Sequence, residues 1–250
     1  MPADLKVTLL QHTPLPERAV ASAGRLCYAP VSAAELKQTM SDDDVRRLVR
    51  GLIRSGHMSA LEHAGFTFAI DGISRACSHQ LVRHRVASYS QQSQRYVRFG
   101  PEGGFVIPPR IASSSEARAV FYEAMDDARR AYERLVELGL AEGRGKESVF
   151  EDARFVLPNA AETKIVVTMN ARELRHFFSL RCCRRAQWEI NRLAWTMRHL
   201  ASSVAPLLFE DTGPGCMTGG CHEGKMSCGD PYTEEEVLAM DLVRSIGGVD

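Results

Sequence analysis

The run Arg83-His84-Arg85-Val86-Ala87-Ser88-Tyr89-Ser90-Gln91-Gln92-Ser93-Gln94-Arg95-Tyr96 is dense in side chains that form hydrogen bonds. It follows a segment, Ile73–His84, whose apolar residues have helical spacing, and we expect the chain to leave that helix and enter irregular structure here. The arginines could hold more than one phosphate, because arginine makes bidentate hydrogen bonds and nearby backbone N–H groups add fixed dipoles. Arg83-His84-Arg85 taken alone fits a solvated basic turn better than a phosphate site.

Toward the N-terminus, the pattern predicts short strands and capped helices. We expect strands at Lys6–Leu10 and Phe66–Ile70, both rich in β-branched or aromatic residues. A first helix is expected at Pro16–Cys27. Ser32 and Glu35 form a capping box that predicts the start of a second helix, and a third should run from Ser41 to about Ser55.

Toward the C-terminus, the prediction is mostly helical. A capping box of Ser113 and Glu116 opens a long helix that should stop at Gly139, and Thr163–Met169 has the composition of a central strand. Further helices are expected at 146–156, 171–182, 186–204 and after Thr233. Few strands among many helices predict one α+β domain over residues 1–250, with an irregular Gly/Pro/Cys-rich tail at about 210–232.

Composition limits the classes of function. The 31 basic and 31 acidic side chains cancel, which argues against a surface built to bind nucleic acid or a membrane. No apolar run reaches the ~18 residues of a membrane span, and Met1–Leu10 lacks the order of a signal peptide. Seven cysteines, with Cys182 and Cys183 adjacent in a predicted helix, suit a reducing compartment. We therefore expect a cytoplasmic protein.

The central run also resembles a known signature. Arg-His-Arg, then seven residues, then Ser93-Gln94-Arg95-Tyr96 is similar to the motif of flavin-dependent thymidylate synthases. Other stretches resemble the same family over about residues 20–210: Gly56–His63 leading into Phe66–Phe68, Glu151–Pro158, and Asn170–Leu174 with Phe177, Leu180, Arg181 and Ala186–Ile190.

The resemblance implies a mixed α/β core, a homotetramer whose active sites are shared between subunits, and an FAD cofactor. FAD contacts would come from Ser59, Arg83, His84, Arg85, Val86, Gln91, Asn170, Ala171, Arg172 and His176, with His57 and Glu62 nearby. These residue types suit the group, because a pyrophosphate needs charge-assisted donors and an isoalloxazine ring needs flat faces and polar edges.

The resemblance also implies the substrates. The chain would methylate dUMP to dTMP, with 5,10-methylenetetrahydrofolate as carbon donor and NADPH as the reductant of FAD. dUMP contacts would come from Gln80, Leu81, Val82, Arg83, Gln91, Gln92, Ser93, Gln94, Arg95, Arg154 and Arg181. Arg181 is the predicted catalytic residue. No cysteine nucleophile is expected, since Cys77, Cys182 and Cys183 have no evident paired base.

Some residues depart from the family pattern or extend beyond it. Cys27 stands where many relatives have a hydroxyl residue, and Arg185 where many have His, so the FAD contacts at both positions stay open. In the tail, the possible zinc ligands are Cys216, Cys221, His222 and Cys228. Their spacing matches no familiar paired motif, and we predict no bound metal.

Two other classes of function remain open. A module for single-stranded nucleic acid could use the arginine-rich run, with Tyr89, Tyr96 and Phe99 as stacking faces. Such a protein would be colourless, and its oligonucleotide binding would depend steeply on salt. A flavoenzyme acting on another nucleotide would be yellow but would not bind dUMP.

Overall fold

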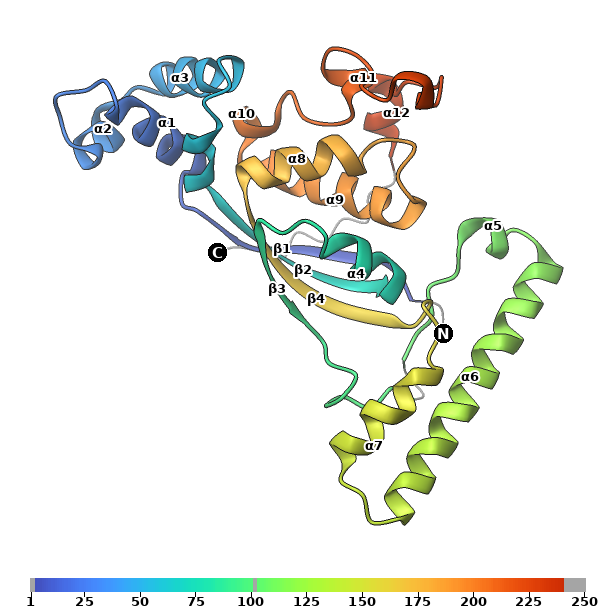
Figure 1. The fold of residues 1–250 in the computed structure, drawn as a ribbon. Coiled ribbons are helices and arrows are strands. Elements are labelled where there is room, and N and C mark those ends of the chain that lie inside the picture. The colour runs from blue at the N-terminus through green and yellow to red at the C-terminus, as the bar shows by residue number, and fades with distance from the viewer. Residues whose placement is uncertain (1–2, 101–102, 241–250) are drawn as a thin grey trace. The chain divides into compact units, whose positions relative to one another are not determined.

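The fold of the computed structural model, which describes residues 3–100 and 103–240, contains a four-stranded sheet and many helices (Figure 1). The strand order is β1 (Lys6–His12), β2 (Gly65–Ser74), β4 (Glu162–Asn170) and β3 (Ala87–Gln91). Burial alternates along β4, as expected of a strand with one covered face. The predicted mixed α/β class is therefore confirmed.

The chain divides into two compact units, and β2, β3 and β4 contribute residues to both. The first unit contains the chain up to Leu5, Ile70–Leu81 and Ser90–Ile165. The second contains Lys6–Ala69, Val82–Tyr89 and the chain from Val166 onward.

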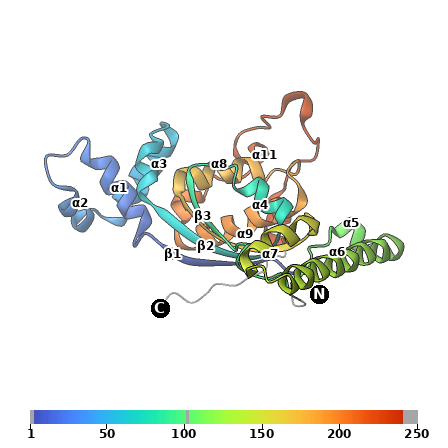
Figure 2. The same ribbon diagram turned by 60° about the horizontal axis from the view of Figure 1, so that its bottom comes forward.

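The first unit has its own hydrophobic core under a long helix. Its helices are α4 (Arg75–Leu81), α5 (Pro109–Ala112), α6 (Ser115–Ala141), α7 (Lys146–Ala153) and the 3-10 turn η2 (Arg154–Val156). Figure 2 shows α7 lying beside α6, and the two helices pack together. Buried side chains from both helices meet Phe99 and Phe105 in one cluster. Burying an aromatic side chain of this kind stabilises the unit by about 2 kcal/mol.

A close backbone approach in this unit requires glycine. Gly72 in β2 has φ +73°, and a Cβ there would lie 1.9 Å from the carbonyl oxygen of Asp4. Any side chain would separate these two backbones, so this segment of β2 can lie against the chain start only with glycine.

The second unit carries the larger set of helices. They are α1 (Pro16–Leu26), α2 (Ala33–Thr39), α3 (Asp42–Arg54), η1 (Met58–His63), α8 (Ala171–Arg181), α9 (Trp188–Val204), α10 (Pro206–Phe209), α11 (Gly215–Thr218), η3 (Gly224–Met226) and α12 (Glu234–Ala239).

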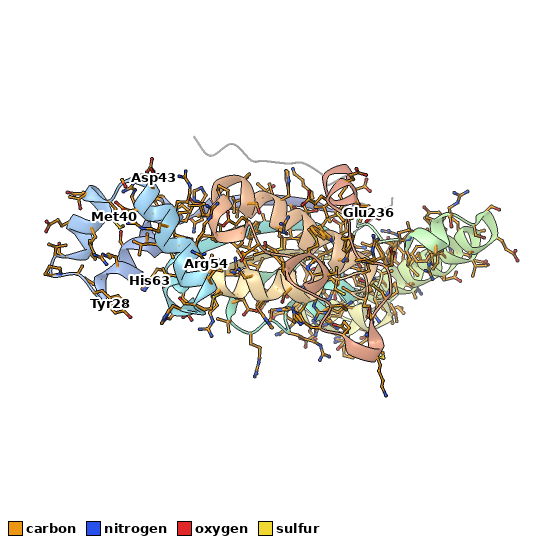
Figure 3. All side chains as sticks on the ribbon, turned by 90° about the horizontal axis from the view of Figure 1, so that it is seen from above. Tyr28, Met40, Asp43, Arg54, His63 and Glu236 are labelled. Atoms are coloured by element: carbon orange, nitrogen blue, oxygen red, sulfur yellow. The ribbon has the colours of Figure 1, made fainter. Side chains whose placement is uncertain are left out.

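Aromatic packing and helix pairing hold this second unit together. Phe209 contacts both Phe66 and Phe178 edge-on, with ring centroids 5.4 Å and 5.8 Å away. Helices α8 and α9 lie side by side (Figure 1). Asp43 and Arg54, near the two ends of α3, are exposed, and Figure 3 labels both. This packing places the N-terminus of α8 at the end of β4, where several predicted site residues lie.

The structure corrects four predicted boundaries. The central run is not irregular, because Ala87–Gln91 forms β3 and pairs beside β4. Helix α4 ends at Leu81, before the arginines. The cap of α6 is Ser114, whose side chain accepts from Ala117 N–H, and not Ser113. Helix α6 also continues through Gly139, which is buried and leaves room for Val149, since a Cβ there would lie 2.8 Å from that side chain.

The remaining predictions hold with small shifts. Ser32 and Ser41 cap their helices through backbone N–H groups, and Thr233 with Glu236 forms a complete capping box. Helix α8 ends at Arg181, so Cys182 is its C-cap and Cys183 lies beyond it, outside the helix predicted to contain them. Short turns interrupt the tail, but most of it is irregular, as expected.

Candidate functional site

The junction between β4 and α8 gathers three of the predicted FAD residues in the second unit. Asn170 ends β4 and caps α8, because its Oδ1 accepts a hydrogen bond from Glu173 N–H at 2.9 Å. Ala171 N–H donates to the Ala64 carbonyl at 2.7 Å, which fixes the start of the helix. Arg172 Nη1 donates to Glu62 Oε1 at 2.5 Å. The positive end of a helix and an arginine therefore lie together, as an anion site requires.

A pocket of about 420 Å³ opens at this junction. It is lined by Glu62, Val86, Asn170, Arg172, Glu173 and His176. Arg172 and His176 also line a second pocket of about 320 Å³, to which Met58, Ser179 and Thr212 contribute. The structure thus groups Val86, Asn170, Arg172 and His176 around one cavity. It leaves Ser59, Arg83 and Arg85 exposed and outside both linings.

His84 is buried beneath this pocket and hydrogen-bonded at both ring nitrogens. Its Nδ1 lies 3.2 Å from Glu173 Oε1, and Arg181 Nε donates to its Nε2 at 3.1 Å. The ring packs edge-on against Phe177 at 4.9 Å, and Tyr89 Oη donates to the His84 carbonyl at 2.8 Å. Sequence reasoning placed His84 and Arg181 in the site but did not foresee that they would touch each other.

Burial shifts the pKa values of both His84 and Glu173. It lowers the pKa of the His84 imidazole to about 4, with Arg181 and His176 acting in the same direction. Burial also raises the pKa of the Glu173 carboxyl above its usual range, against the opposing effect of His176. At neutral pH the imidazole is uncharged, so it orients neighbouring groups without adding a positive charge.

The predicted nucleotide residues of the first unit lie on α4, at the end of β3 and after it. Gln91 Nε2 donates to Ser78 Oγ at 3.1 Å and to Thr163 Oγ1 at 3.0 Å, so its amide nitrogen is committed inside the unit. Ser93 Oγ accepts from Arg95 N–H at 3.1 Å. The amide nitrogen of Gln94 is buried without a hydrogen-bond partner in the part of the chain that the structure describes. Buried donors without a partner are uncommon in folded proteins, so this amide is available to a further group.

Two glutamates hold the arginines of this set. Arg95 contacts Glu147 at 2.7 Å and Glu151 at 2.6 Å, and Arg154 Nε donates to the Glu151 carbonyl at 3.2 Å. Gln80 is half-buried on α4. Sequence reasoning gave Glu147 and Glu151 no role in the site. The signal was available at Glu151, which belongs to one of the family-like blocks.

The tail residues gather around a separate pocket of about 390 Å³ in the second unit. Cys183, Cys216, Cys221, His222 and Cys228 line it, together with Ser179 and Leu180 of α8. Cys221 Sγ lies 3.5 Å from Ser227 Oγ, a contact that lowers the pKa of its thiol. Across residues 3–100 and 103–240, no three histidine, cysteine or acidic side chains are grouped as a metal site would need. The metal content of the tail stays a prediction.

The two departures from the family pattern lie at the surface. Cys27 is the exposed C-cap of α1, and Arg185 Nη1 contacts Glu223 at 2.9 Å. Within the described residues, no helix is both long enough and apolar enough to cross a membrane.

Comparison with known proteins points to one family. The family profile described as "Thymidylate synthase complementing protein" matches residues 8–207, a range that contains every predicted site residue and ends before the tail cysteines. A protein of Geobacter sulfurreducens named flavin-dependent thymidylate synthase is 58% identical over 226 residues, covering 90% of this chain and 94% of the relative. A protein of the same name from Clostridium tetani is 48% identical over 233 residues, covering 90% and 93%.

A solved structure shows the same architecture. The UMP/dUMP methylase PolB from Streptomyces cacaoi, bound with 5-Br dUMP, aligns with a TM-score of 0.71 and 28% sequence identity. The alignment covers 83% of this chain and 94% of that chain.

Proposed function

The chain belongs to the flavin-dependent thymidylate synthase family, and on this premise we propose that it catalyses the reductive methylation of dUMP to dTMP. The carbon donor in this proposal is 5,10-methylenetetrahydrofolate, which leaves as tetrahydrofolate, and NADPH reduces the flavin. The observation that supports it best is the pocket at the start of α8, where Arg172 and His176 meet a capped helix N-terminus.

The residues around this pocket fit FAD. Pyrophosphate oxygens accept charge-assisted hydrogen bonds and are stabilised by the positive end of a helix dipole. Arg172 and the start of α8 lie together at this pocket, beside the His176 imidazole. Arg172 is now paired with Glu62, but both side chains are about half exposed, and such a pair contributes at most about 1 kcal/mol. A bound diphosphate could therefore replace Glu62 as its partner. When bound, FAD supplies the two-electron chemistry that the reaction needs from a cofactor.

Arg181 is our proposed catalytic residue. Carbon five of uracil must become electron-rich, and ionising the imide at nitrogen three achieves this because the charge spreads into the ring. A fixed guanidinium would stabilise that anion. Among the described residues, Arg181 makes one side-chain hydrogen bond, through Nε to His84, so its two terminal nitrogens are available to a substrate.

Cys77 and Cys182 are poor candidates for a nucleophile in this reaction. Burial raises the pKa of the Cys182 thiol far above its usual range, and Cys77 is fully buried. A thiol that stays protonated attacks slowly. This supports a mechanism in which the uracil ring is activated by a cation and not by covalent attack.

Purified protein tests the proposal directly. It should be yellow, should bleach with NADPH in the absence of oxygen, and should form dTMP only when dUMP and methylenetetrahydrofolate are both present. Colourless protein that binds oligonucleotides with a steep salt dependence would instead support the nucleic-acid alternative. Yellow protein without dUMP binding would support a flavoenzyme for another nucleotide.

The assembly and location are part of the same proposal. We infer a homotetramer with shared active sites from family membership, and a cytoplasmic location from the free cysteines, which suit a reducing compartment. Light scattering of the flavin-loaded protein measures the first, and a dimer or monomer would contradict it.

A further inference from the structure

Two hydrogen bonds of His84, one to Arg181 and one to Glu173, together set where the imidazole proton lies. The Nε–H group of arginine can only donate, so His84 Nε2, at 3.1 Å, must offer a lone pair. A neutral imidazole then carries its proton on Nδ1, and that N–H donates to Glu173 Oε1 at 3.2 Å. The three side chains form one directed chain from carboxylate to imidazole to guanidinium.

Burial makes the other arrangements unfavourable. The side chain of His84 is 5% exposed and that of Glu173 is 9% exposed, so water cannot replace a lost partner. A proton on Nε2 would point at the Nε–H group of Arg181, and Nδ1 would then have no proton to donate to Glu173. Leaving buried polar groups unmatched in this way is costly, because desolvation is no longer offset by a hydrogen bond.

The contacts of Arg181 with the described residues leave the two terminal nitrogens of its guanidinium for a ligand. Its backbone carbonyl accepts a hydrogen bond from Asn191 Nδ2 at 2.9 Å, and its Nε is held by His84. Its Nη1 and Nη2 have no hydrogen bond within the described part of the chain. With the backbone and Nε both fixed, the direction of the terminal edge is set before any ligand arrives.

We propose that Glu173 is a positioning residue: it accepts the Nδ1 proton of His84 and thereby makes His84 Nε2 the acceptor that orients Arg181 toward the uracil imide. This inference rests on the proposed function, because it concerns the same site. Glu173 does not need to touch the substrate, and its effect reaches the reaction through the two side chains that follow it.

The test compares two substitutions of similar size. Glu173→Met removes the acceptor but keeps the length and helix propensity of the side chain, whereas Glu173→Gln keeps an acceptor oxygen. We expect Glu173→Met to lower kcat per bound flavin by about ten- to hundredfold, with KM for dUMP changing much less, since a supporting contact of this kind typically has an effect of that size. Glu173→Gln should recover most of the rate.

Glu17→Met is the matched control. Glu17 also lies in the first turn of a helix of the second unit, burial raises its pKa, and its Oε1 accepts from Leu207 N–H at 2.7 Å. This substitution likewise removes a carboxylate acceptor, and within the described residues the hydrogen bond of that carboxylate goes to Leu207 and not to His84, Glu173 or Arg181. It should lower the melting temperature and leave kcat unchanged.

A second readout separates orientation from simple destabilisation. Nitrogen-15 NMR of labelled histidine distinguishes Nδ1–H from Nε2–H, and His84→Gln identifies the His84 signal among the eight histidines. We expect Nδ1–H in the parent and in Glu173→Gln, and a shift toward Nε2–H in Glu173→Met.

Three results would overturn the inference: parent kcat in Glu173→Met, an equal loss of rate in both substitutions, or an unchanged tautomer alongside a fall in rate. If the parent protein itself makes no dTMP, the proposed function fails. The NMR measurement then still decides whether Glu173 sets the tautomer of His84.

Discussion

Replacing Arg181 by lysine is the sharpest test of the proposed chemistry, because the structure shows two separate tasks for one guanidinium. Its Nε–H donates to His84 Nε2 at 3.1 Å, while its terminal nitrogens remain free for a ligand. Lysine has a single nitrogen on a flexible stem. That nitrogen can take the place of Nε beside His84 or extend toward the substrate, but it cannot do both.

The size of the effect follows from the loss of one preorganised contact to developing charge. Such a contact contributes about 3 kcal/mol to the transition state, and this corresponds to about a hundredfold in rate. Binding of dUMP should weaken less, because the imide is not yet ionised in the ground state. We therefore expect Arg181→Lys to keep its flavin and its oligomeric state and to lose most dTMP formation.

The assay is single-turnover dTMP formation at saturating dUMP and methylenetetrahydrofolate, normalised to bound flavin. Arg198→Lys is the control, because Arg198 Nε also donates within the second unit, to the Thr212 carbonyl at 2.9 Å, and lies outside the predicted site. It should affect stability and not the rate. Parent-like dTMP formation by Arg181→Lys would refute the reasoning.

The remaining predictions each use one measurement. Arg172→Ala should give folded but paler protein, since only an exposed pair with Glu62 is lost from the fold, and full flavin retention would count against the assignment. Ser93→Ala should weaken dUMP binding but keep measurable activity. Ser93 Oγ accepts from Arg95 N–H, and among the described residues no base is hydrogen-bonded to it. A trapped covalent adduct on Ser93 would contradict this. Elemental analysis should find no stoichiometric zinc, and one equivalent lost in Cys216→Ser would prove the prediction wrong. Finally, burial lowers the pKa of His84 from 6.5 to about 4 in the folded chain, so the unfolded state binds the extra proton between these values. Stability therefore falls by about 3 kcal/mol as pH drops through this window. Glu173, whose pKa is raised, opposes this loss, so the measurement is the difference in unfolding free energy between the parent and His84→Gln; a difference that does not change with pH would exclude it.

Local chemistry made much of the fold predictable from the sequence. Helix caps such as Ser32, Ser41 and Thr233 depend on side chains within three residues of the groups they satisfy, so a short window contains the necessary information. The strand β4 could be recognised for the same reason, since its β-branched content and alternation are properties of nine consecutive residues. The family motifs are likewise contiguous.

Pairing and burial could not be read from such windows. The segment Ala87–Gln91 is polar and lacks a strand pattern, and it becomes β3 only because β4 offers it an edge to pair with. Gly139 has the chemistry of a helix stop, yet α6 continues through it to Ala141, and the missing side chain leaves room for Val149 of α7. In both cases the tertiary context overrides the local preference.

The site shows the same division. The sequence alone determined which residue types are present: the arginines, His84 and the capped start of α8 all lie in motifs that can be recognised one residue at a time. Only the tertiary structure decided that Glu173, His84 and Arg181 form a hydrogen-bonded chain. His84 is 89 positions from Glu173 and 97 positions from Arg181 in the sequence. The pKa of His84 and the direction of Arg181 are consequences of that packing, since both depend on which groups exclude water from the imidazole and not on its neighbours along the chain.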